Sequence, residues 1–350
     1  MRTLRCVLTG VGNIGRSFLE MLPAREALLR ERYALELRIV GLADSSGTAY
    51  HESGFASLDV VAMKQAGRGV AELEGGVPGG DPRGLLRAPD VDLLLEATPT
   101  NLRDGEPGLG IVRTALERGI PAVLASKGPL VLAYAELEHL SDLRGPGKPA
   151  LRFSGAVGGA LPSINLGRRD LAGSHIRRVE AVLNGTTQVI LSLMSEGQPF
   201  PDALAAAQAM GIVEPDSSLD VDGWDAASKL VILANGVLRQ PVTLDDVRVT
   251  GIRAVTREEL DGARATGGRI SVMGLAEAID EPGPATRYHL SVAPTVLPAG
   301  HPLADMALGE LGIVYTSDIA GRSVARSLED GPLGSCAAML RDVIAIFGQA

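Results

Sequence analysis

The chain has few of the residues that form metal centres. Its 350 residues include two cysteines and five histidines. Cys6 and Cys336 show no CxxC or Cys/His spacing, and the histidines are scattered, so the sequence gives no support to a metal site built from these residues. Cys6 lies in the apolar segment LRCVLTG and is expected to be a small buried hydrophobic residue.

Aromatic residues, basic runs and long apolar runs are also scarce. Aromatics make up 3% of the chain, so the core must be built mainly from Ala, Val, Leu and Ile, as in α/β folds. The net charge of −9 and the lack of clustered basic residues argue against nucleic acid as a partner. No apolar run is long enough to cross a membrane, and no signal peptide is recognisable. We expect a soluble, cytoplasmic protein with no membrane partner.

What the sequence does contain is a regular alternation of strand and helix patterns. Segments 2–9, 35–44 and 91–100 are apolar and end in polar residues, and helical patterns separate them over short connections. Segment 91–100 is almost continuously apolar, as expected of a central parallel strand buried on both faces. The pattern predicts a doubly wound parallel sheet of the Rossmann type over residues 1–150, a dinucleotide-binding domain.

The pattern changes after a plausible hinge, RGPGKP, at residues 144–149. Residues 151–330 mix strands and helices and predict a second, α+β domain. The segment 331–350 contains an amphipathic helix, which we expect to pack back on the first domain.

Three glycines follow the first predicted strand. Gly10, Gly12 and Gly15 form a GxGxxG turn that opens a predicted helix. In such a turn the first glycine permits the tight turn, the second lets backbone approach a pyrophosphate, and the third permits close helix–strand packing. A glycine-rich turn without a ligand is the alternative. The strand, the helix and a later acidic residue together favour a dinucleotide site that includes Asn13 and Ile14.

Asp44 ends the second predicted strand. An acidic residue there commonly hydrogen-bonds the adenosine ribose and favours NAD. Ser45 and Ser46 follow and could receive a 2′-phosphate, which Lys64 or Arg68 could neutralise. The sequence therefore leaves NAD and NADP both open.

Two further strands end in polar residues. Thr98 follows the central strand, and Ser126 and Lys127 follow the next one. Ligands bind at the carboxyl ends of strands in such sheets, so all three are candidate cofactor contacts. A lysine at that edge is more often solvated, but an ammonium beside nicotinamide and substrate is a sensible alternative.

An acidic stretch, EPDSSLDVDGWDAASK, precedes the apolar run LVIL. Asp225 and Lys229 are four residues apart, so on a helix they share a face and can pair. An exposed pair would contribute only about 0.3–0.5 kcal/mol and would signify little. The apolar run indicates a partly buried face instead, where a carboxylate can tune a lysine as proton donor or acceptor. Glu214 and Asp220 could then hold a substrate ammonium group.

This stretch resembles the signature of homoserine dehydrogenases. The signature has an alanine, a glycine and an acidic loop ending D-x-x-G-x-D-x-x-x-K, which correspond here to Ala207, Gly211, Asp220, Gly223, Asp225 and Lys229. The likeness covers nearly the whole chain and includes the segments GVGNIG, ATPTN, ASKGPL, AVGGALP, VLNGTT, HPLA and DVI.

The resemblance implies NAD(P)-dependent interconversion of L-homoserine and L-aspartate 4-semialdehyde, in the biosynthesis of threonine, methionine and isoleucine. It implies that Lys229 is the general acid/base, that Asp225 binds and orients the substrate, and that Lys127 lies between nicotinamide and substrate. The other substrate ligands that it implies are Glu214, Asp220 and Thr186. The other cofactor contacts that it implies are Thr98, Gly211 and Gly331. It also implies a homodimer formed through the sheet of the second domain.

Several positions depart from the family pattern. Ser154 stands where many members have a glutamate that helps to bind a sodium ion, together with backbone carbonyls such as those of Val157, Gly159 and Leu161. A Na⁺ site at those carbonyls is therefore an open expectation.

Two departures concern the cofactor side. Ser126 replaces the asparagine that usually precedes the lysine, and the C-terminal glycine-rich turn is shortened to DGPLGS around Gly331. The chain ends at residue 350, so we expect no feedback inhibition through a C-terminal regulatory domain.

Three other functions compete with this interpretation. Aspartate-semialdehyde dehydrogenase requires a nucleophilic cysteine, and neither Cys6 nor Cys336 lies at a strand end near the cofactor. A Rossmann dehydrogenase for a related amino-bearing alcohol is the nearest rival. A non-catalytic dinucleotide-sensing module is the third, and the Asp225–Lys229 pair counts against it, because such a module has no use for a tuned proton donor.

Overall fold

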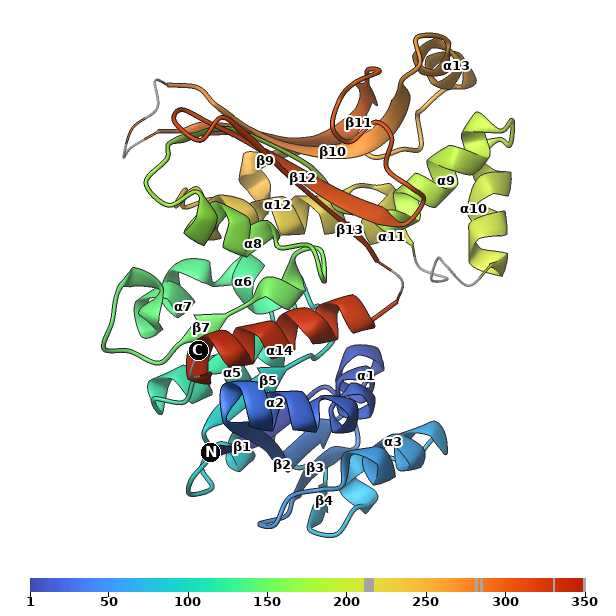
Figure 1. Cartoon of the computed structure of the whole chain (residues 1–350). Coiled ribbons are helices and arrows are strands. Elements are labelled where there is room, and N and C mark those ends of the chain that lie inside the picture. Colours follow the sequence, from blue (N-terminus) through green and yellow to red (C-terminus); the bar gives the residue numbers. More distant parts are fainter. Residues whose placement is uncertain (211–216, 281–282, 284–285, 330, 349–350) are drawn as a thin grey trace. The chain divides into compact units, whose positions relative to one another are not determined.

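The computed structural model describes residues 1–210, 217–280, 283, 286–329 and 331–348. The chain forms two compact units, one of residues Met1–Ala160 with Gly331–Ala350 and one of residues Leu161–Asp330 (Figure 1). No described helix is long and apolar enough to cross a membrane.

The first unit is built on a seven-stranded sheet with the order β4-β3-β2-β1-β5-β6-β7. Its strands are β1 (Arg2–Thr9), β2 (Leu35–Asp44), β3 (Gly47–Tyr50), β4 (Gly76–Pro78), β5 (Leu93–Glu96), β6 (Ala122–Leu124) and β7 (Leu151–Arg152). Strands β2, β1, β5, β6 and β7 are parallel, whereas β3 and β4 extend the sheet in antiparallel fashion. The predicted doubly wound α/β fold is confirmed.

Helices cover this sheet and close its core. They are α1 (Asn13–Met21), α2 (Glu26–Tyr33), α3 (Ser57–Gln65), α4 (Pro82–Leu85), α5 (Gly108–Glu117), α6 (Gly128–Leu132), α7 (Tyr134–Leu140) and α14 (Leu333–Phe347). Helix α14 packs against α1, and its Cys336, Met339 and Val343 join the apolar core beneath β1. Cys6 is fully buried in the same core, and burial raises the pKa of its thiol, so it is a packing residue.

The first unit extends past residue 150, where the sequence placed the domain boundary. Strand β7 pairs with β6 and so completes the first sheet. The short 3₁₀ helix η4 (Ser154–Ala156) packs against α14, which belongs to the same unit. These contacts hold residues 151–160 to the first unit, although their sequence resembles the start of a new domain.

The second unit has a six-stranded mixed sheet with the order β13-β12-β8-β10-β11-β9. Its strands are β8 (Ile176–Val182), β9 (Val247–Val249), β10 (Arg269–Ala278), β11 (Tyr288–Leu297), β12 (Glu310–Ser317) and β13 (Arg322–Leu328). Its helices are α8 (Ser163–Asn165), α9 (Gly185–Ser195), α10 (Phe200–Ala209), α11 (Ser218–Val221), α12 (Trp224–Gly236) and α13 (Arg257–Ala265). Helices α9 and α12 pack on β10, which fixes the turn that enters α9 and the first turns of α12 near each other.

Candidate active site

The glycine-rich turn leaves space that the protein itself does not fill. Gly10 has φ +83°, and a Cβ there would lie 2.3 Å from the carbonyl oxygen of Ala97. A Cβ on Gly15 would lie 2.1 Å from the Gly10 carbonyl oxygen, whereas a Cβ on Gly12 would meet nothing within 4 Å. Packing therefore requires the first and third glycines but not the second. The second keeps open the position from which a pyrophosphate would approach the start of α1, whose first turn has no side-chain cap.

Asp44 is held by its own domain. Its side chain is 7% exposed, and Oδ2 accepts hydrogen bonds from Lys64 Nζ at 2.5 Å and from the Val70 N–H at 3.2 Å. Its Oδ1 accepts from the N–H and Oγ of Ser46 at 2.8 and 2.6 Å. Burial opposes ionisation of Asp44, but these hydrogen bonds outweigh it and lower the pKa of the carboxyl. Lys64 thus neutralises Asp44.

Glu96, which the sequence analysis missed, lies beside the predicted cofactor contacts. It ends β5, is fully buried, and accepts hydrogen bonds from the N–H of Thr98 at 2.8 Å and from the hydroxyls of Thr98 and Ser126. Burial raises the pKa of this carboxyl, since its partners are all neutral. Glu96 therefore fixes Thr98 and Ser126 in place. An acid closing the apolar strand LLLE was the available signal. Lys127 follows at the start of α6, and its N–H lies 3.4 Å from the Thr100 hydroxyl.

In the second unit, Asp225 and Lys229 form the predicted pair on α12. Lys229 Nζ lies 2.8 Å from Asp225 Oδ2, and the two side chains are 13% and 16% exposed. Lys229 Nζ also donates a hydrogen bond of 2.5 Å to the carbonyl of Leu183, at the end of the strand that precedes α9. The pair is mostly buried, so the alternative of a solvated surface pair does not apply.

Asn184 links Asp220 to this pair through hydrogen bonds. Its Nδ2 donates to Asp220 Oδ1 at 2.6 Å and to Asp225 Oδ2 at 3.0 Å. Its Oδ1 accepts from the N–H of Thr187 at 2.8 Å, which makes it the N-cap of α9. At 4% exposure the side chain is buried. Sequence reasoning missed this role, although an asparagine before GTT at a strand-to-helix turn is a typical N-cap signal.

Residues 162–344 match the family model for homoserine dehydrogenase. An NAD(+)-dependent homoserine dehydrogenase of Pseudomonas canavaninivorans is 31% identical over 351 residues, which cover 100% of this chain and 98% of that protein. The chain belongs to the homoserine dehydrogenase family. A homoserine dehydrogenase of Methanocaldococcus jannaschii is 32% identical, with 97% of this chain and 98% of that protein covered. The homoserine dehydrogenase structure from Thiobacillus denitrificans superposes with a TM-score of 0.81 at 25% identity, over 99% of this chain and 74% of that one.

Family membership confirms the resemblance drawn from the sequence and the class of reaction. The protein is an NAD(P)-dependent oxidoreductase that acts on a CH–OH group.

Several residues that the resemblance implied are only partly placed. Gly211 and Glu214 lie outside the described residues. Thr186 lies half-buried in the first turn of α9, two residues after the Asn184 cap. Gly331 has φ +79° and precedes Pro332, the N-cap of α14.

The carbonyls suggested for a cation belong to both units: Val157 and Gly159 to the first, and Leu161 to the second. Val157 and Gly159 follow η4, and the carbonyl of Leu161 accepts a hydrogen bond from the N–H of Ser163 at 2.8 Å. Ser154 donates from both N–H and Oγ to the buried Asp342, at 2.7 Å each. Among the described residues, no group of three or more His, Cys, Asp or Glu could hold a metal ion.

Proposed function

We propose that the protein interconverts L-homoserine and L-aspartate 4-semialdehyde, with Lys229 as the residue that moves the proton. The observation that supports this most is the mostly buried pair of Lys229 and Asp225, held within 2.8 Å. An amine in that setting is positioned, and shielded from water, in the way proton transfer requires.

In the oxidation direction, Lys229 Nζ accepts the proton of the substrate hydroxyl. When bound, NAD(P) supplies the hydride acceptor. Asp225 keeps the Lys229 amine oriented, and Asn184 keeps Asp225 oriented through its hydrogen bond of 3.0 Å. In the reduction direction Lys229 returns the proton to the carbonyl oxygen.

We assign two carboxylates as the ligands of the substrate ammonium group. Asp220 lies beside Asn184, which holds it at 2.6 Å, and Glu214 is the second carboxylate that we assign, by the family likeness. Thr186 is assigned to the substrate as well. On the cofactor side we assign the turn from Gly10 to Gly15, with Asn13 and Ile14.

The remaining cofactor contacts are Thr98, Ser126, Lys127, Gly211 and Gly331. Glu96 supports the first two of these by accepting their hydrogen bonds. We propose that NAD is preferred over NADP, since Asp44 occupies Lys64 in an ion pair at the end of β2, and Lys64 is then not available to neutralise a 2′-phosphate. The relative from Pseudomonas canavaninivorans is described as NAD(+)-dependent.

The decisive experiment is reduced-nicotinamide formation by purified protein with L-homoserine, using NAD and NADP separately. Lys229→Ala should abolish turnover while cofactor affinity, measured by fluorescence titration, stays unchanged. Lys148→Ala removes an exposed lysine and serves as the control with unchanged turnover. Faster oxidation of another amino-bearing alcohol would favour the rival dehydrogenase. Cofactor binding without turnover of any such alcohol would favour a sensing module.

Two further proposals follow from the family likeness. A homodimer formed through the sheet of the second unit should appear as twice the chain mass in light scattering. A Na⁺ ion at the carbonyls of Val157, Gly159 and Leu161 should make activity fall when choline replaces sodium, and unchanged activity would contradict a Na⁺ site there.

A further inference from the structure

A cavity of about 390 Å³ opens within the second unit, away from Lys229 and Asp225. It is walled by α9, α13 and the start of β10. Its apolar lining includes Leu191, Leu260 and Ile270, and its polar lining includes Gln188, Ser192 and Arg269. Cavities of this size with an apolar wall and a few polar groups are typical of small-molecule sites.

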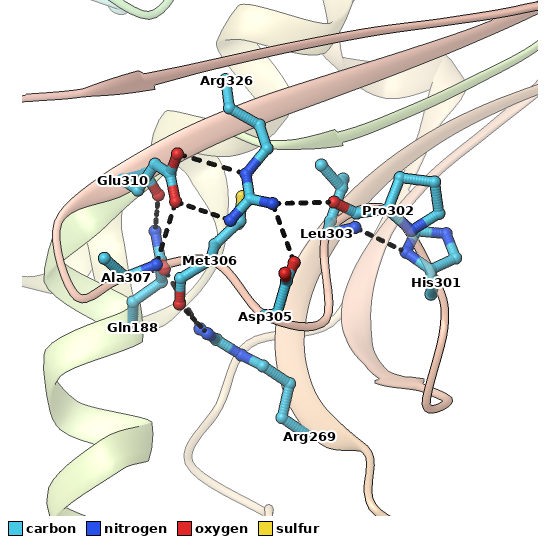
Figure 2. Close-up of polar contacts among 10 residues, drawn as sticks. All are labelled: Gln188, Arg269, His301, Pro302, Leu303, Asp305, Met306, Ala307, Glu310 and Arg326. Carbon is cyan, nitrogen blue, oxygen red and sulfur yellow. Dashed lines mark hydrogen bonds and ion pairs between the residues drawn. The ribbon is translucent and has the colours of Figure 1, made fainter.

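Arg269 is the half-buried cation of this cavity. Its Nη1 donates to the Met306 carbonyl at 2.8 Å and its Nη2 to Gln188 Oε1 at 3.1 Å (Figure 2). Its Nε donates to Ser271 Oγ at 3.1 Å. All three partners are neutral, and no described carboxylate forms an ion pair with it. A guanidinium has five N–H donors, so two remain beyond these three bonds. Burial, reinforced by the charge of Arg326, lowers the pKa of Arg269.

The carboxylates in the same network serve another cation. Glu310 accepts from Arg326 Nε at 3.1 Å and from Nη2 at 2.8 Å, and Asp305 accepts from Arg326 Nη1 at 2.8 Å (Figure 2). Within the part of the chain that the structure describes, Arg269 therefore has no carboxylate counterion, and its position is partly desolvated. Such a charge is unfavourable unless an anion joins it, and a carboxylate suits the planar guanidinium.

We propose that this cavity is a second ligand site, for a small monocarboxylate with a short branched apolar group. The carboxylate binds Arg269, and the apolar group packs against Leu191, Leu260 and Ile270. Glu196 and Arg264 are exposed and also line the cavity. An α-amino acid and its analogue without the amino group share this chemistry, and Glu196 would favour the amino acid by binding its ammonium. The proposal does not depend on the function proposed for Lys229.

The test uses the full chain with isovalerate and its neutral isostere isovaleramide, followed by calorimetry and by saturation-transfer NMR. Isovalerate should bind, and isovaleramide should bind about tenfold more weakly or not at all, because only the carboxylate pairs with the guanidinium. Arg269→Gln should weaken isovalerate binding by about tenfold or more. Arg264→Gln, the same change at an exposed arginine lining the cavity, should change it by less than about threefold. Equal binding of both probes, or unchanged binding by the Arg269 variant, would overturn the proposal.

Arg269 also anchors the Met306 carbonyl, so its variant can lose structure. Ser192 lines the cavity and is not a hydrogen-bond partner of Arg269, so Ser192→Phe should reduce the cavity volume without removing a partner of Arg269, and we expect it to abolish isovalerate binding. Unchanged binding in this variant places the ligand elsewhere and refutes the site. L-leucine distinguishes an amino-acid ligand from a simple carboxylate. If L-leucine binds more tightly than isovalerate, and Glu196→Gln weakens its binding, the ligand is an amino acid. Tighter binding of isovalerate assigns a simple carboxylate, and no binding of either compound overturns the proposal.

Discussion

Asn184→Asp tests how the carboxylates beside Lys229 are held. Aspartate has the shape of asparagine, and its oxygen still accepts from the Thr187 N–H, so the N-cap of α9 is kept. The variant loses the two hydrogen bonds donated to Asp220 and Asp225, at 2.6 and 3.0 Å. It also places a third carboxylate against these two.

Hydrogen bonds to charged groups contribute about 1.5–3 kcal/mol each, so the two lost bonds account for about 3–6 kcal/mol before relaxation. Relaxation of the two carboxylates recovers part of this, and we expect the free energy of unfolding to fall by about 2–4 kcal/mol. Displacement of Asp225 should lower kcat/KM for L-homoserine by about a hundredfold, which is about 2.7 kcal/mol of transition-state stabilisation. Urea unfolding followed by circular dichroism and steady-state homoserine oxidation measure the two effects.

Asn235→Asp is the matched control. Asn235 is buried on the same helix as Lys229, and its Nδ2 donates to the carbonyls of Val231 and Val242 at 3.0 and 2.8 Å. Its Oδ1 accepts from the N–H of Val242 at 3.2 Å, so the number of bonds equals that at Asn184. This variant should lose stability while kcat/KM stays within about twofold of the wild-type value at a temperature where it is folded. Wild-type kcat/KM in the Asn184 variant, or an equal loss in both, would refute a positioning role for Asn184.

Three other predictions concern the cofactor domain. Gly12→Ala should leave the free energy of unfolding within about 1 kcal/mol of the wild-type value, yet weaken NAD(P) binding about tenfold or more in fluorescence titrations. Gly15→Ala should instead lower the free energy of unfolding by more than about 2 kcal/mol, because its Cβ would lie 2.1 Å from the Gly10 carbonyl oxygen. Asp44→Asn should raise the use of NADP relative to NAD in kcat/KM. Because the pKa of Asp44 is lowered in the fold, its contribution to stability is present above its ordinary value of 3.8 and is lost on acidification, so urea unfolding should show wild type and variant converging as pH falls. Burial raises the pKa of Glu96, so the contribution of Glu96 to stability is present below its ordinary value of 4.5 and is lost as pH rises. Relative to Glu96→Gln, the wild-type protein should therefore lose stability from acidic to neutral pH. A parallel pH dependence of the two proteins would contradict this.

The sequence by itself determined the architecture of the first domain and the family. The period-two and apolar strand patterns, the GVGNIG turn and the short connections are local features, and local patterning decides which elements form and in what order. The spacing of Asp225 and Lys229 likewise placed both on one face of a helix, because that depends only on helical geometry.

The tertiary structure decided which environments these residues occupy. Asn184 meets Asp225 only because the strand before α9 and the first turn of α12 are brought together, and no local pattern encodes that contact. Whether Lys64 meets a phosphate or Asp44, and whether Glu96 is buried, likewise depends on packing between distant segments. Arg269 has no carboxylate partner among the described residues because Arg326 occupies Glu310 and Asp305, and that division also depends on tertiary contacts. Local pattern specifies elements, whereas burial and partners arise from contacts far apart in the chain, and these set the charge and the chemistry of each site.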